Sequence, residues 1–431
     1  PQPLTMINIF KKLKNSIHKY FFPFFKKEDL KELFKILEEN KDDSKEVAMF
    51  VGGCVRNHLK FEKVKDIDIA TVFSPEEIKK KFDGTKFKLI ETGIDHGSLT
   101  LINGKNKYEL TTLRKDIITD GRHAEIEKIN NWREDSNRRD FTINSIYLNI
   151  KGKIFDPQNG LSDLNNNVVK FIGDPEKRIQ EDYLRIIRFI RFSIQYEAEV
   201  DISTIQAIKL NLNGIKNISK ERIFNELLKI LKLKNFYKIN DDNNLQSIFL
   251  LIFPEIKYLN RIKYWANNED VFNLDIANKL AILTLDDKDN YEYFCHKYKT
   301  SKAMTNKFAF LANCYKDYKR DKQFFEQNLK KNLYFYGKET LQLINLINQL
   351  SKKNNNKKDL FIDIKNKIKS TKIPTFPFDG DYLKKKGLKE GAILGKILKQ
   401  IEKDWLKGNF TISDKKIEEI INSQKIPFKY N

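Results

Sequence analysis

The spacing of apolar residues predicts alternating strands and helices in the first third of the chain. Residues 47–53 (VAMFVGG) predict a buried strand that ends in two glycines, and residues 56–60 begin a helix. Residues 66–71 (DIDIAT) predict a second strand. Residues 98–113 (SLTLINGKNKYELTTL) predict a hairpin that turns near Asn103 and Gly104. These elements predict a mixed α/β head that ends near residue 151.

A different pattern governs the rest of the chain. From about Asp174 onward Leu, Ile and Phe recur at helical spacing, which predicts helices to the C-terminus. Residues 351–359 (SKKNNNKKD) predict a linker, and residues 371–381 (TKIPTFPFDGD) a turn-rich join. The predicted class is α+β, with an all-helical neck, body and tail after the head. The expected extension, head, neck, body and tail are residues 1–28, 29–151, 152–240, 241–350 and 351–431.

Charge and composition narrow the range of partners. A chain of 431 residues is too long for one ordinary core. Its net charge of +21, from 80 Lys and Arg against 59 Asp and Glu, points first to nucleic acid and second to an anionic membrane surface. Some of the lysines also fit the Lys, Asn and Ile bias of an AT-rich genome. Three cysteines without metal-ligand spacing fit a reducing, cytosolic compartment.

The N-terminal extension allows two interpretations. Residues 9–27 (IFKKLKNSIHKYFFPFFKK) are basic and aromatic, as in a membrane-contacting or targeting segment. Pro23 interrupts the run, and a packed leading helix explains it equally. No stretch reaches the roughly eighteen apolar residues of a membrane span, so we expect no stable membrane association.

Two carboxylates share one side of the second strand. Side chains alternate along a strand, so Ile67 and Ile69 point into a core while Asp66 and Asp68 point the other way. One interpretation is the solvated face of an edge strand. The other is a divalent metal site, because hard cations take carboxylate oxygens and cancel their repulsion.

The preceding glycines help to choose between these interpretations. In residues 51–57 (VGGCVRN), Gly52 and Gly53 end a strand where a helix begins, and Arg56 follows one turn later. By itself this is a tight turn, but glycines also let backbone amides approach a phosphate. An anion cradle next to a carboxylate pair is what phosphoryl or nucleotidyl transfer requires.

Two later segments carry further charged groups. Residues 138–149 (RRDFTINSIYLN) place two arginines and an acid before an apolar run. Residues 173–192 (GDPEKRIQEDYLRIIRFIRF) predict one amphipathic helix with a polar stripe and a buried side. The stripe comprises Arg178, Asp182, Arg185 and Arg188, and the buried side Ile179, Leu184, Ile187 and Ile190. The plainest interpretation of the stripe is a surface ion pair between Asp182 and Arg185.

Seven segments in order resemble the class II tRNA nucleotidyltransferases, the CCA-adding enzymes of bacteria and eukaryotes. They are GGCVRN, DID, TGIDHGSLT, YELTTLRKD, DGRH, RRDFTIN and EDYLRIIRFIRF. The later stretches 219–231 and 376–405 resemble long bacterial members, with a weaker middle between Lys234 and Asp363. The resemblance implies a polymerase-β-like nucleotidyltransferase head. It also implies a neck that recognises the nucleotide, and a helical neck, body and tail that hold the upper half of the tRNA through basic surface.

The resemblance also implies roles for individual residues. Asp66 and Asp68 would hold two Mg²⁺ ions, with Glu109 as a third carboxylate nearby. Gly52, Gly53 and Arg56 would hold the triphosphate. The ribose and base pocket would be lined by Arg139, Asp140 and Asn144. The stretch 115–131, with Asp120 and Gly121, resembles the mobile loop that changes shape between C and A addition.

Asp182 and Arg185 match the chemistry of base selection. Cytosine and adenine each present an amino donor beside a ring-nitrogen acceptor, whereas uracil and guanine present a carbonyl beside an N–H. A carboxylate only accepts and a guanidinium only donates, so this pair suits C and A. Arg188 and Arg191 would reinforce the pair or meet phosphates, and Arg191 could equally pack against the helix.

One position departs from the family pattern. Asn57 stands where members carry aspartate, which removes a negative charge but keeps an acceptor oxygen. We expect a template-independent enzyme that adds or repairs the 3′-terminal CCA of tRNA from CTP and ATP, in a bacterial cytoplasm or an organelle.

Three rival functions remain. A bacterial poly(A) polymerase shares most head and neck motifs, although residues 91–101 (ETGIDHGSLTL) look more like the CCA-adding form. A CC-adding or A-adding enzyme would share the same motifs. A non-catalytic RNA-binding protein fits the charge, but gives no reason for Asp66 and Asp68 to share a face beside a glycine turn.

Overall fold

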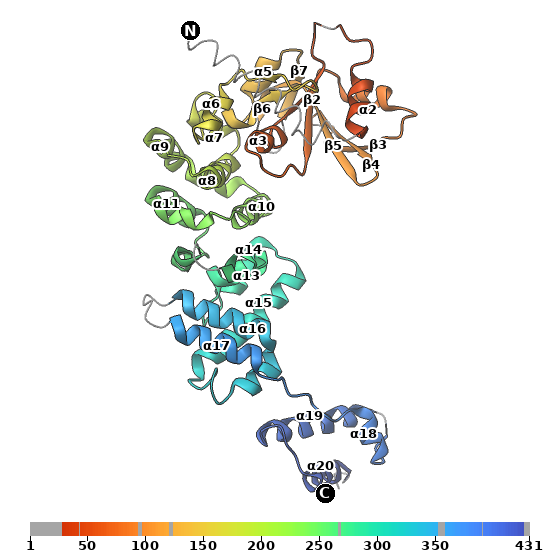
Figure 1. The fold of residues 1–431 in the computed structure, drawn as a ribbon, viewed down its shortest axis with the longest axis vertical. Coiled ribbons are helices and arrows are strands. Elements are labelled where there is room, and N and C mark those ends of the chain that lie inside the picture. Colours follow the sequence, from red (N-terminus) through yellow and green to blue (C-terminus); the bar gives the residue numbers. More distant parts are fainter. Residues whose placement is uncertain are drawn as a thin grey trace, which may run out of the picture. The chain divides into compact units, whose positions relative to one another are not determined.

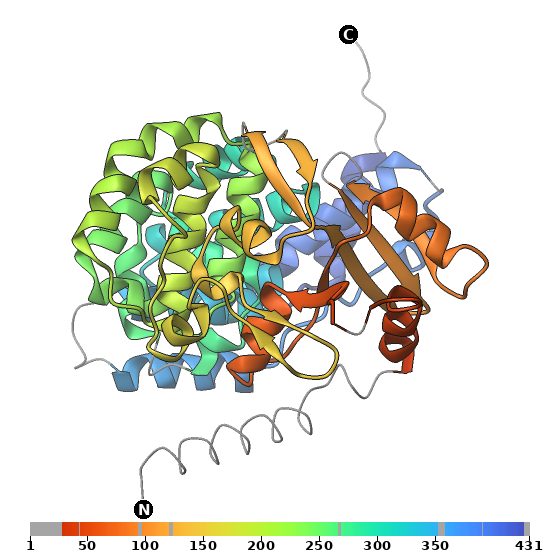
Figure 2. The same ribbon diagram turned by 90° about the horizontal axis from the view of Figure 1, so that it is seen from above.

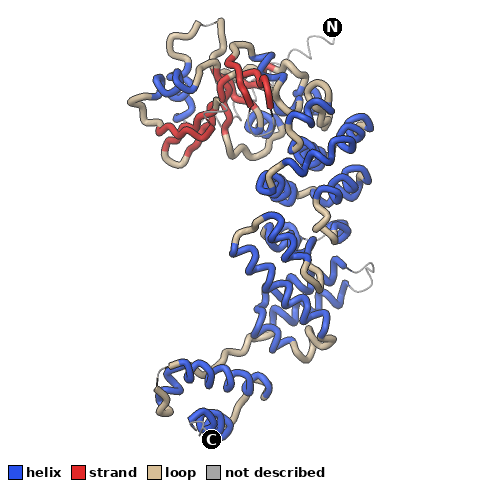
Figure 3. Tube along the Cα trace, turned by 180° about the vertical axis from the view of Figure 1, so that it is seen from behind, coloured by secondary structure: helices blue, strands red, loops and turns tan. Residues whose placement is uncertain are grey.

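The computed structural model describes residues 28–42, 44–93, 97–119, 124–265, 269–351, 358–389 and 391–425. The N-terminal extension, for which a membrane, targeting or packed-helix role was expected, lies outside these residues up to residue 27. The chain forms two compact units, residues 1–254 and 255–431. Figure 3 shows that the described strands belong to the first unit and that the second is helical. The predicted α+β class is confirmed.

A mixed seven-stranded sheet forms the centre of the head (Figure 1). Its order is β3-β4-β5-β2-β1-β8-β9, in which β2 and β5 are parallel and the other neighbours antiparallel. The strands are β1 Ala48–Val51, β2 Ile67–Thr71, β3 Lys88–Gly93, β4 Ser98–Asn103, β5 Asn106–Thr112, β8 Tyr147–Leu148 and β9 Ile154–Phe155. The hairpin of β4 and β5 turns where the sequence predicts.

Four helices accompany this sheet: α2 Glu28–Leu37, α3 Gly53–Leu59, α4 Pro75–Phe82 and α5 Trp132–Asn137. Helix α4 begins with a capping box. The Ser74 amide donates to the Glu77 carboxylate over 2.6 Å, and the Glu77 amide donates to the Ser74 hydroxyl over 3.3 Å. Strand β1 is buried throughout, whereas β2 buries Ile67 and Ile69 and leaves the Asp68 side partly open. Asp68 is therefore the one residue of β1 and β2 that is not fully buried.

A separate two-stranded ribbon occupies most of the stretch that resembles the mobile loop. Strand β6, Arg114–Thr119, pairs with β7, Ala124–Lys128, in antiparallel register. Figure 2 shows this ribbon in light orange, apart from the darker strands of the large sheet. Asp120 and Gly121 lie outside the described residues.

The remaining helices of the first unit follow the predicted helical pattern with one difference. They are α6 Gly160–Asn165, α7 Pro175–Glu181, α8 Leu184–Tyr196, α9 Ile202–Asn211, α10 Lys220–Leu231 and α11 Asn243–Ile252, with 3-10 turns η3 Thr142–Asn144, η4 Leu212–Asn217 and η5 Phe236–Asp241. The sequence predicts one helix across residues 173–192, and that prediction is wrong. Asp182 is extended, with φ −154° and ψ 104°, and separates α7 from α8. The Asp182 carboxylate accepts the Leu184 amide over 3.1 Å, so this residue starts a helix as well as ending one.

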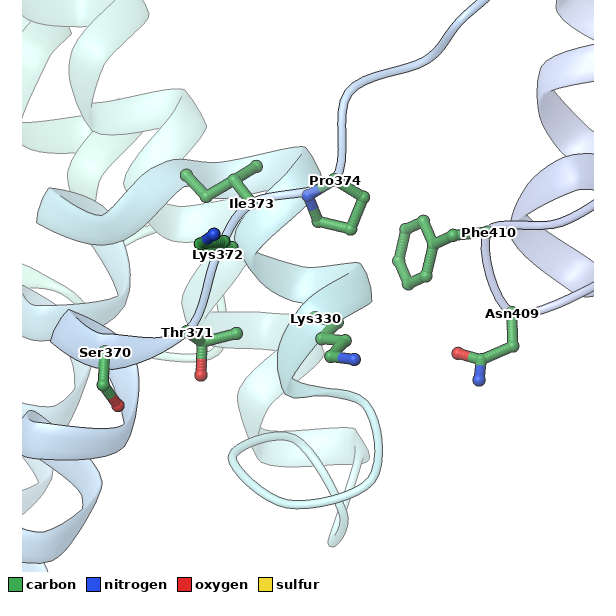
Figure 4. Close-up of a pocket in the computed structure, with 8 residues that line it drawn as sticks. All are labelled: Lys330, Ser370, Thr371, Lys372, Ile373, Pro374, Asn409 and Phe410. Carbon is green, nitrogen blue, oxygen red and sulfur yellow. The ribbon is translucent and has the colours of Figure 1, made fainter.

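The second unit is helical in every described element. It contains η6 Leu259–Tyr264, α12 Glu269–Phe272, α13 Ile276–Thr284, α14 Asn290–Tyr298, α15 Lys302–Arg320, α16 Leu329–Ser351, α17 Lys358–Ser370, α18 Gly380–Lys385, α19 Ala392–Lys407 and α20 Asp414–Lys425. Most of the predicted linker at 351–359 lies outside the described residues. Residues 371–379 of the predicted join form the loop between α17 and α18, the first part of which Figure 4 shows in close-up, and residues 380–381 begin α18. Helices α18 to α20 share a small apolar core around Leu383, Ile397 and Ile401.

The described helices include none that is long and apolar enough to cross a membrane. Cys54, Cys295 and Cys314 are all buried free thiols.

Candidate active site

The turn between β1 and α3 uses a backbone conformation that only glycine adopts readily. Gly52 has φ +75° and ψ −137°, outside the regions open to residues with a side chain. A Cβ built on Gly52 would lie 3.5 Å from the Asp68 Oδ2 atom. Gly53 then starts α3. The turn therefore brings bare backbone close to the carboxylate of the neighbouring strand.

Three carboxylates lie on or next to the adjacent strands β2 and β5 at this part of the sheet. Asp68 and Glu109 are direct partners in the parallel pairing of β2 and β5, and Asp66 precedes β2 as an exposed residue. Burial, together with the negative charges of Glu109 and Asp66, raises the pKa of Asp68 to about 6, although Arg139 and Arg56 oppose the shift. Within the described ranges, no three His, Cys, Asp or Glu side chains are grouped closely enough to hold a metal ion.

A cavity of about 480 Å³ gathers most of the predicted site residues. It is lined by Gly52, Gly53, Arg56, Asp68, Arg139, Asp140, Asn144, Asp182, Leu184, Arg185, Arg188, Arg191, Phe192 and Arg222. Asp66 and Glu109 are the predicted residues that do not line it. One cavity is thus lined by the glycine turn, by the RRD segment (residues 138–140) and by helices that lie more than 100 residues apart in sequence.

Arg56 and Asp140 belong to one hydrogen-bonded chain across the cavity. The Arg56 guanidinium donates to the Asn144 side-chain oxygen. The Asn144 amide donates to Asp140 over 2.9 Å, and Arg188 donates to the other Asp140 oxygen over 2.7 Å. Burial would raise the pKa of Asp140, but the Arg188 charge and the hydrogen bonds from Asn144 and Arg188 together outweigh burial and hold the pKa well below its usual value. Arg188 is therefore a partner of the RRD segment.

Arg139 is fixed from behind by a fully buried carboxylate. Asp135 accepts Arg139 over 3.1 Å, Arg138 over 2.9 Å and the Tyr147 hydroxyl over 2.7 Å. Burial opposes ionisation, but the Arg139 and Arg138 charges outweigh it and lower the pKa of Asp135 to about 2. The Arg139 guanidinium is thus held in position at the cavity wall.

Asp182 and Arg185 line the same cavity but do not pair with each other. Asp182 accepts Arg222 over 2.7 Å, and Arg185 donates to Glu181 over 2.6 Å. The surface ion pair between Asp182 and Arg185 that the sequence suggests is wrong, because the break at Asp182 turns its carboxylate toward α10. Each member of the pair is held by a separate charged neighbour.

Arg191 both packs and lines the cavity. It donates to the buried Glu226 over 2.7 Å, and its guanidinium lies 4.0 Å from the Phe192 ring centroid. Arg56 and Arg188 also lie near this ring, at 4.6 and 5.6 Å. Phe192 is therefore an aromatic support shared by three guanidinium groups.

Several site residues were not predicted. Leu184, Phe192 and Arg222 line the cavity, while Glu181 and Glu226 hold its arginines. Arg222 and Glu226 lie four residues apart within 219–231, a segment that the sequence marks only by its resemblance to bacterial members. Asn57, at the departing position, accepts Arg56 over 3.1 Å, so its side-chain oxygen contacts the predicted phosphate ligand.

Three family models match successive parts of the chain. The Poly A polymerase head domain matches residues 48–170, the "Probable RNA and SrmB- binding site of polymerase A" residues 199–259, and tRNA nucleotidyltransferase domain 2 residues 276–421. Together they span the described head, neck and second unit.

Relatives with curated names are similar over most of their length. The CCA-adding enzyme of Ligilactobacillus salivarius is 31% identical over 430 residues, which covers 93% of this chain and 97% of that enzyme. The human mitochondrial CCA tRNA nucleotidyltransferase 1 is 31% identical over 373 residues, covering 83% and 82%.

Solved structures share the fold. The CCA-adding enzyme of Bacillus stearothermophilus, solved with CTP, has a TM-score of 0.65 at 22% identity, covering 93% of this chain and 98% of that one. The Thermotoga maritima CCA-adding enzyme, solved with tRNA, has a TM-score of 0.63 at 21% identity, covering 94% and 98%. With full-length relatives above 30% identity and the same fold, the chain belongs to the CCA-adding enzymes, the family of CCA tRNA nucleotidyltransferases.

Proposed function

We propose that this protein completes the 3′ end of tRNA by adding C, C and A from CTP and ATP, with release of pyrophosphate. The observation that carries the proposal is the single cavity that joins the glycine turn, Asp68 and the Asp182 and Arg185 side chains. A nucleotide in that cavity meets an anion-binding end, a carboxylate end and a base-reading end. The relatives named as CCA-adding enzymes support the same activity.

The triphosphate belongs at the Gly52 end. Backbone amides at the start of α3 face this turn, and the Arg56 and Arg139 guanidiniums supply positive charge. Arg56 is held by Asn144, and Arg139 by Asp135. Both guanidiniums are therefore ordered before the nucleotide arrives, which lowers the cost of orienting them.

The carboxylates fit a divalent cation. Asp68 is partly buried and pairs with Glu109 across β2 and β5. Burial, and after it the Glu109 charge, raises the pKa of Asp68 to about 6, and a bound cation would favour its ionised form. We propose that Asp66 and Asp68, with Glu109 close by, hold the family's Mg²⁺, with two ions for each site. Mg²⁺ bound there would lower the pKa of the attacking hydroxyl and stabilise charge on the phosphates. Asp68 itself supplies an acceptor next to the glycine turn.

The base belongs at the Asp182 end. Asp182 accepts the amino group of cytosine or adenine, and Arg185 donates to the ring nitrogen beside it. Arg222 and Glu181 hold these two side chains in the absence of a base. Uracil and guanine would place a carbonyl against the Asp182 carboxylate and an N–H against the Arg185 guanidinium, and both contacts are unfavourable.

A poly(A) polymerase is the second candidate, because the head matches the model named for that enzyme. One assay separates the two. A tRNA transcript that ends at the discriminator base is incubated with protein and Mg²⁺, and with CTP, with ATP or with both, and the products are resolved to one nucleotide. Two additions with CTP and one final addition with ATP support CCA addition. Long adenosine tails would overturn it, and addition of only CC or only A would restrict it.

A matched variant tests catalysis against RNA binding. Replacing both Asp66 and Asp68 with asparagine keeps size and removes the charge that a cation needs. RNA retention should survive, while nucleotide incorporation should be lost. Incorporation equal to that of the unmodified protein would contradict the assignment of these two carboxylates.

A further inference from the structure

Two arginines of the following helices hold the main chain of the RRD segment. The Arg138 carbonyl accepts the Arg185 guanidinium, which lies 47 residues later on α8, over 3.4 Å. The Arg139 carbonyl accepts the Arg178 guanidinium, which lies 39 residues later on α7. The segment that lines the nucleotide cavity is therefore fixed through its backbone as well as through its side chains.

Arg178 and Arg185 are also joined to each other through Glu181. The Nη1 atom of Arg178 donates to both Glu181 oxygens, over 2.9 and 2.6 Å. The Nη1 atom of Arg185 donates to one of these oxygens over 2.6 Å and to the Arg178 carbonyl over 2.8 Å. These bonds close a ring of three residues where α7 ends and α8 begins.

This ring determines which donors of Arg185 are left for a nucleotide. Arg185 lines the cavity, whereas Arg178 and Glu181 do not. The two N–H groups on Arg185 Nη1 are taken up by Glu181 and by the Arg178 carbonyl. The bond from Nη2 to the Arg138 carbonyl is long, at 3.4 Å, and therefore weak. The Nη2 edge is thus the part of Arg185 that can meet the ring nitrogen of a base.

Stability alone does not account for a buried arginine at position 178. Arg178 is buried, and within the described ranges its Nε atom has no hydrogen-bond partner. A buried N–H group without a partner lowers stability, and an apolar side chain of similar volume would avoid that loss. The Glu181 side chain, by contrast, is 35% exposed. Its carboxylate has room to turn toward solvent unless Arg178 holds it.

We propose that Arg178 is a positioning residue for nucleotide selection, which keeps Arg185 turned toward the base without touching the nucleotide itself. It does so by holding Glu181 and the Arg139 carbonyl at the same time. The inference rests on the proposed reading of the base by Asp182 and Arg185. Without Arg178, Glu181 turns toward solvent and takes the Arg185 guanidinium with it. Cytosine and adenine then lose a favourable contact and uracil and guanine an unfavourable one, so discrimination falls.

The first test measures nucleotide binding to the full chain in the absence of RNA. CTP and UTP are titrated, with Mg²⁺, into the unmodified protein, Arg178→Gln and Lys177→Gln. Lys177 is an exposed neighbour on α7, and its replacement removes the same charge. Arg178→Gln should lower the ratio of CTP to UTP affinity by roughly 10-fold or more, whereas Lys177→Gln should leave it unchanged. An unchanged ratio in a folded Arg178→Gln protein would overturn the inference.

A second variant covers the case in which Arg178→Gln does not fold. Arg178→Lys keeps the buried charge, but an ammonium group lacks the planar fork that reaches Glu181 and the Arg139 carbonyl together. Single-nucleotide incorporation into a tRNA transcript that ends at the discriminator base is compared for CTP and UTP. The kcat/KM for CTP should fall relative to that for UTP, while the KM for RNA stays unchanged. A purely structural role would lower both nucleotides in proportion, and that result would overturn the inference.

A double variant tests whether Arg178 acts through Glu181. Arg178→Gln/Glu181→Gln should lose no more discrimination than Glu181→Gln alone, because both changes release the same Arg185 side chain. Losses that add up would show that Arg178 acts by another route and would overturn the inference.

The binding data also separate this inference from the proposed function. Equal affinity of the unmodified protein for CTP and UTP would mean that Asp182 and Arg185 do not read the base, and the role of Arg178 would fail with that reading. A preference for CTP that both Arg178 variants retain would leave the base reading in place and overturn only the role of Arg178.

Discussion

Asp68 should make the protein less stable at neutral pH while making it active. Its pKa of about 6, against an ordinary 3.8, corresponds to about 3 kcal/mol of unfavourable ionisation. Part of the side chain meets solvent, which screens the interaction, so we expect Asp68→Asn to raise the free energy of unfolding by about 1 to 3 kcal/mol above pH 6. Asparagine keeps the volume and removes the charge.

The pH dependence has a defined sign. A raised folded-state pKa means that the proton on Asp68 contributes stability below pH 3.8, and that this contribution is lost as the pH rises through about 6. The advantage of Asp68→Asn should therefore be near zero at about pH 3, grow as the pH rises from 3.8 to about 6, and be nearly complete at about pH 7. Urea unfolding curves of both proteins across this range measure it.

The effect of Mg²⁺ on thermal stability provides an independent test of the role of Asp68. A cation that binds only the folded state stabilises it by mass action, so Mg²⁺ should raise the Tm of the unmodified protein and leave Asp68→Asn nearly unchanged. For stability in the absence of Mg²⁺, Asp66→Asn is the matched control, because Asp66 is exposed and its replacement should alter stability by less than about 0.5 kcal/mol. An Asp68→Asn variant that is less stable than the unmodified protein at pH 7.5, or a difference independent of pH, would refute the reasoning.

Three other replacements test the roles of individual residues of the candidate active site. Gly52→Ala should lower stability by about 1 to 3 kcal/mol and remove most of the activity, because a φ of +75° strains any side chain and the added carbon faces Asp68. Activity equal to that of the unmodified protein would contradict a phosphate site at Gly52. Asp135→Asn should lower the free energy of unfolding by about 3 kcal/mol. The unmodified protein should lose about 2 kcal/mol of that free energy as the pH falls from 4 to 2, because the pKa of Asp135 is about 2, and the variant should not show this loss. Denaturant unfolding measures both effects. Asp182→Ala should lower kcat/KM for CTP and ATP by roughly 10-fold or more relative to UTP, and unchanged ratios would remove Asp182 from base selection.

The local sequence was enough to predict the elements on either side of the Gly52 turn. Two glycines after an apolar run, and alternation in DIDIAT, predict β1, α3 and β2, because backbone conformation and strand burial are decided by neighbouring residues. The Ser74 to Glu77 capping box is local in the same sense. Most predicted site residues consequently reach one cavity.

Contacts between residues that are distant in sequence could not be predicted from the local sequence pattern. Apolar spacing continues through residues 173–192, so periodicity predicts one helix, whereas Arg222 from α10 pulls the Asp182 carboxylate aside. Asp182 before Tyr183 and Leu184 does carry a helix-start signal that could have been used. Glu226 and Arg191 are 35 residues apart, and their buried pair follows only from the packing of α8 on α10.

The paired arginines of the active site have a consequence for how nucleotide binding responds to its surroundings. Arg139, Arg185, Arg188, Arg191 and Arg222 each already hold a carboxylate. An incoming nucleotide therefore meets guanidiniums whose charges are already balanced by carboxylates, so its binding releases few counterions at this wall. Nucleotide affinity at this wall should be only weakly sensitive to salt, in contrast to the binding of the RNA.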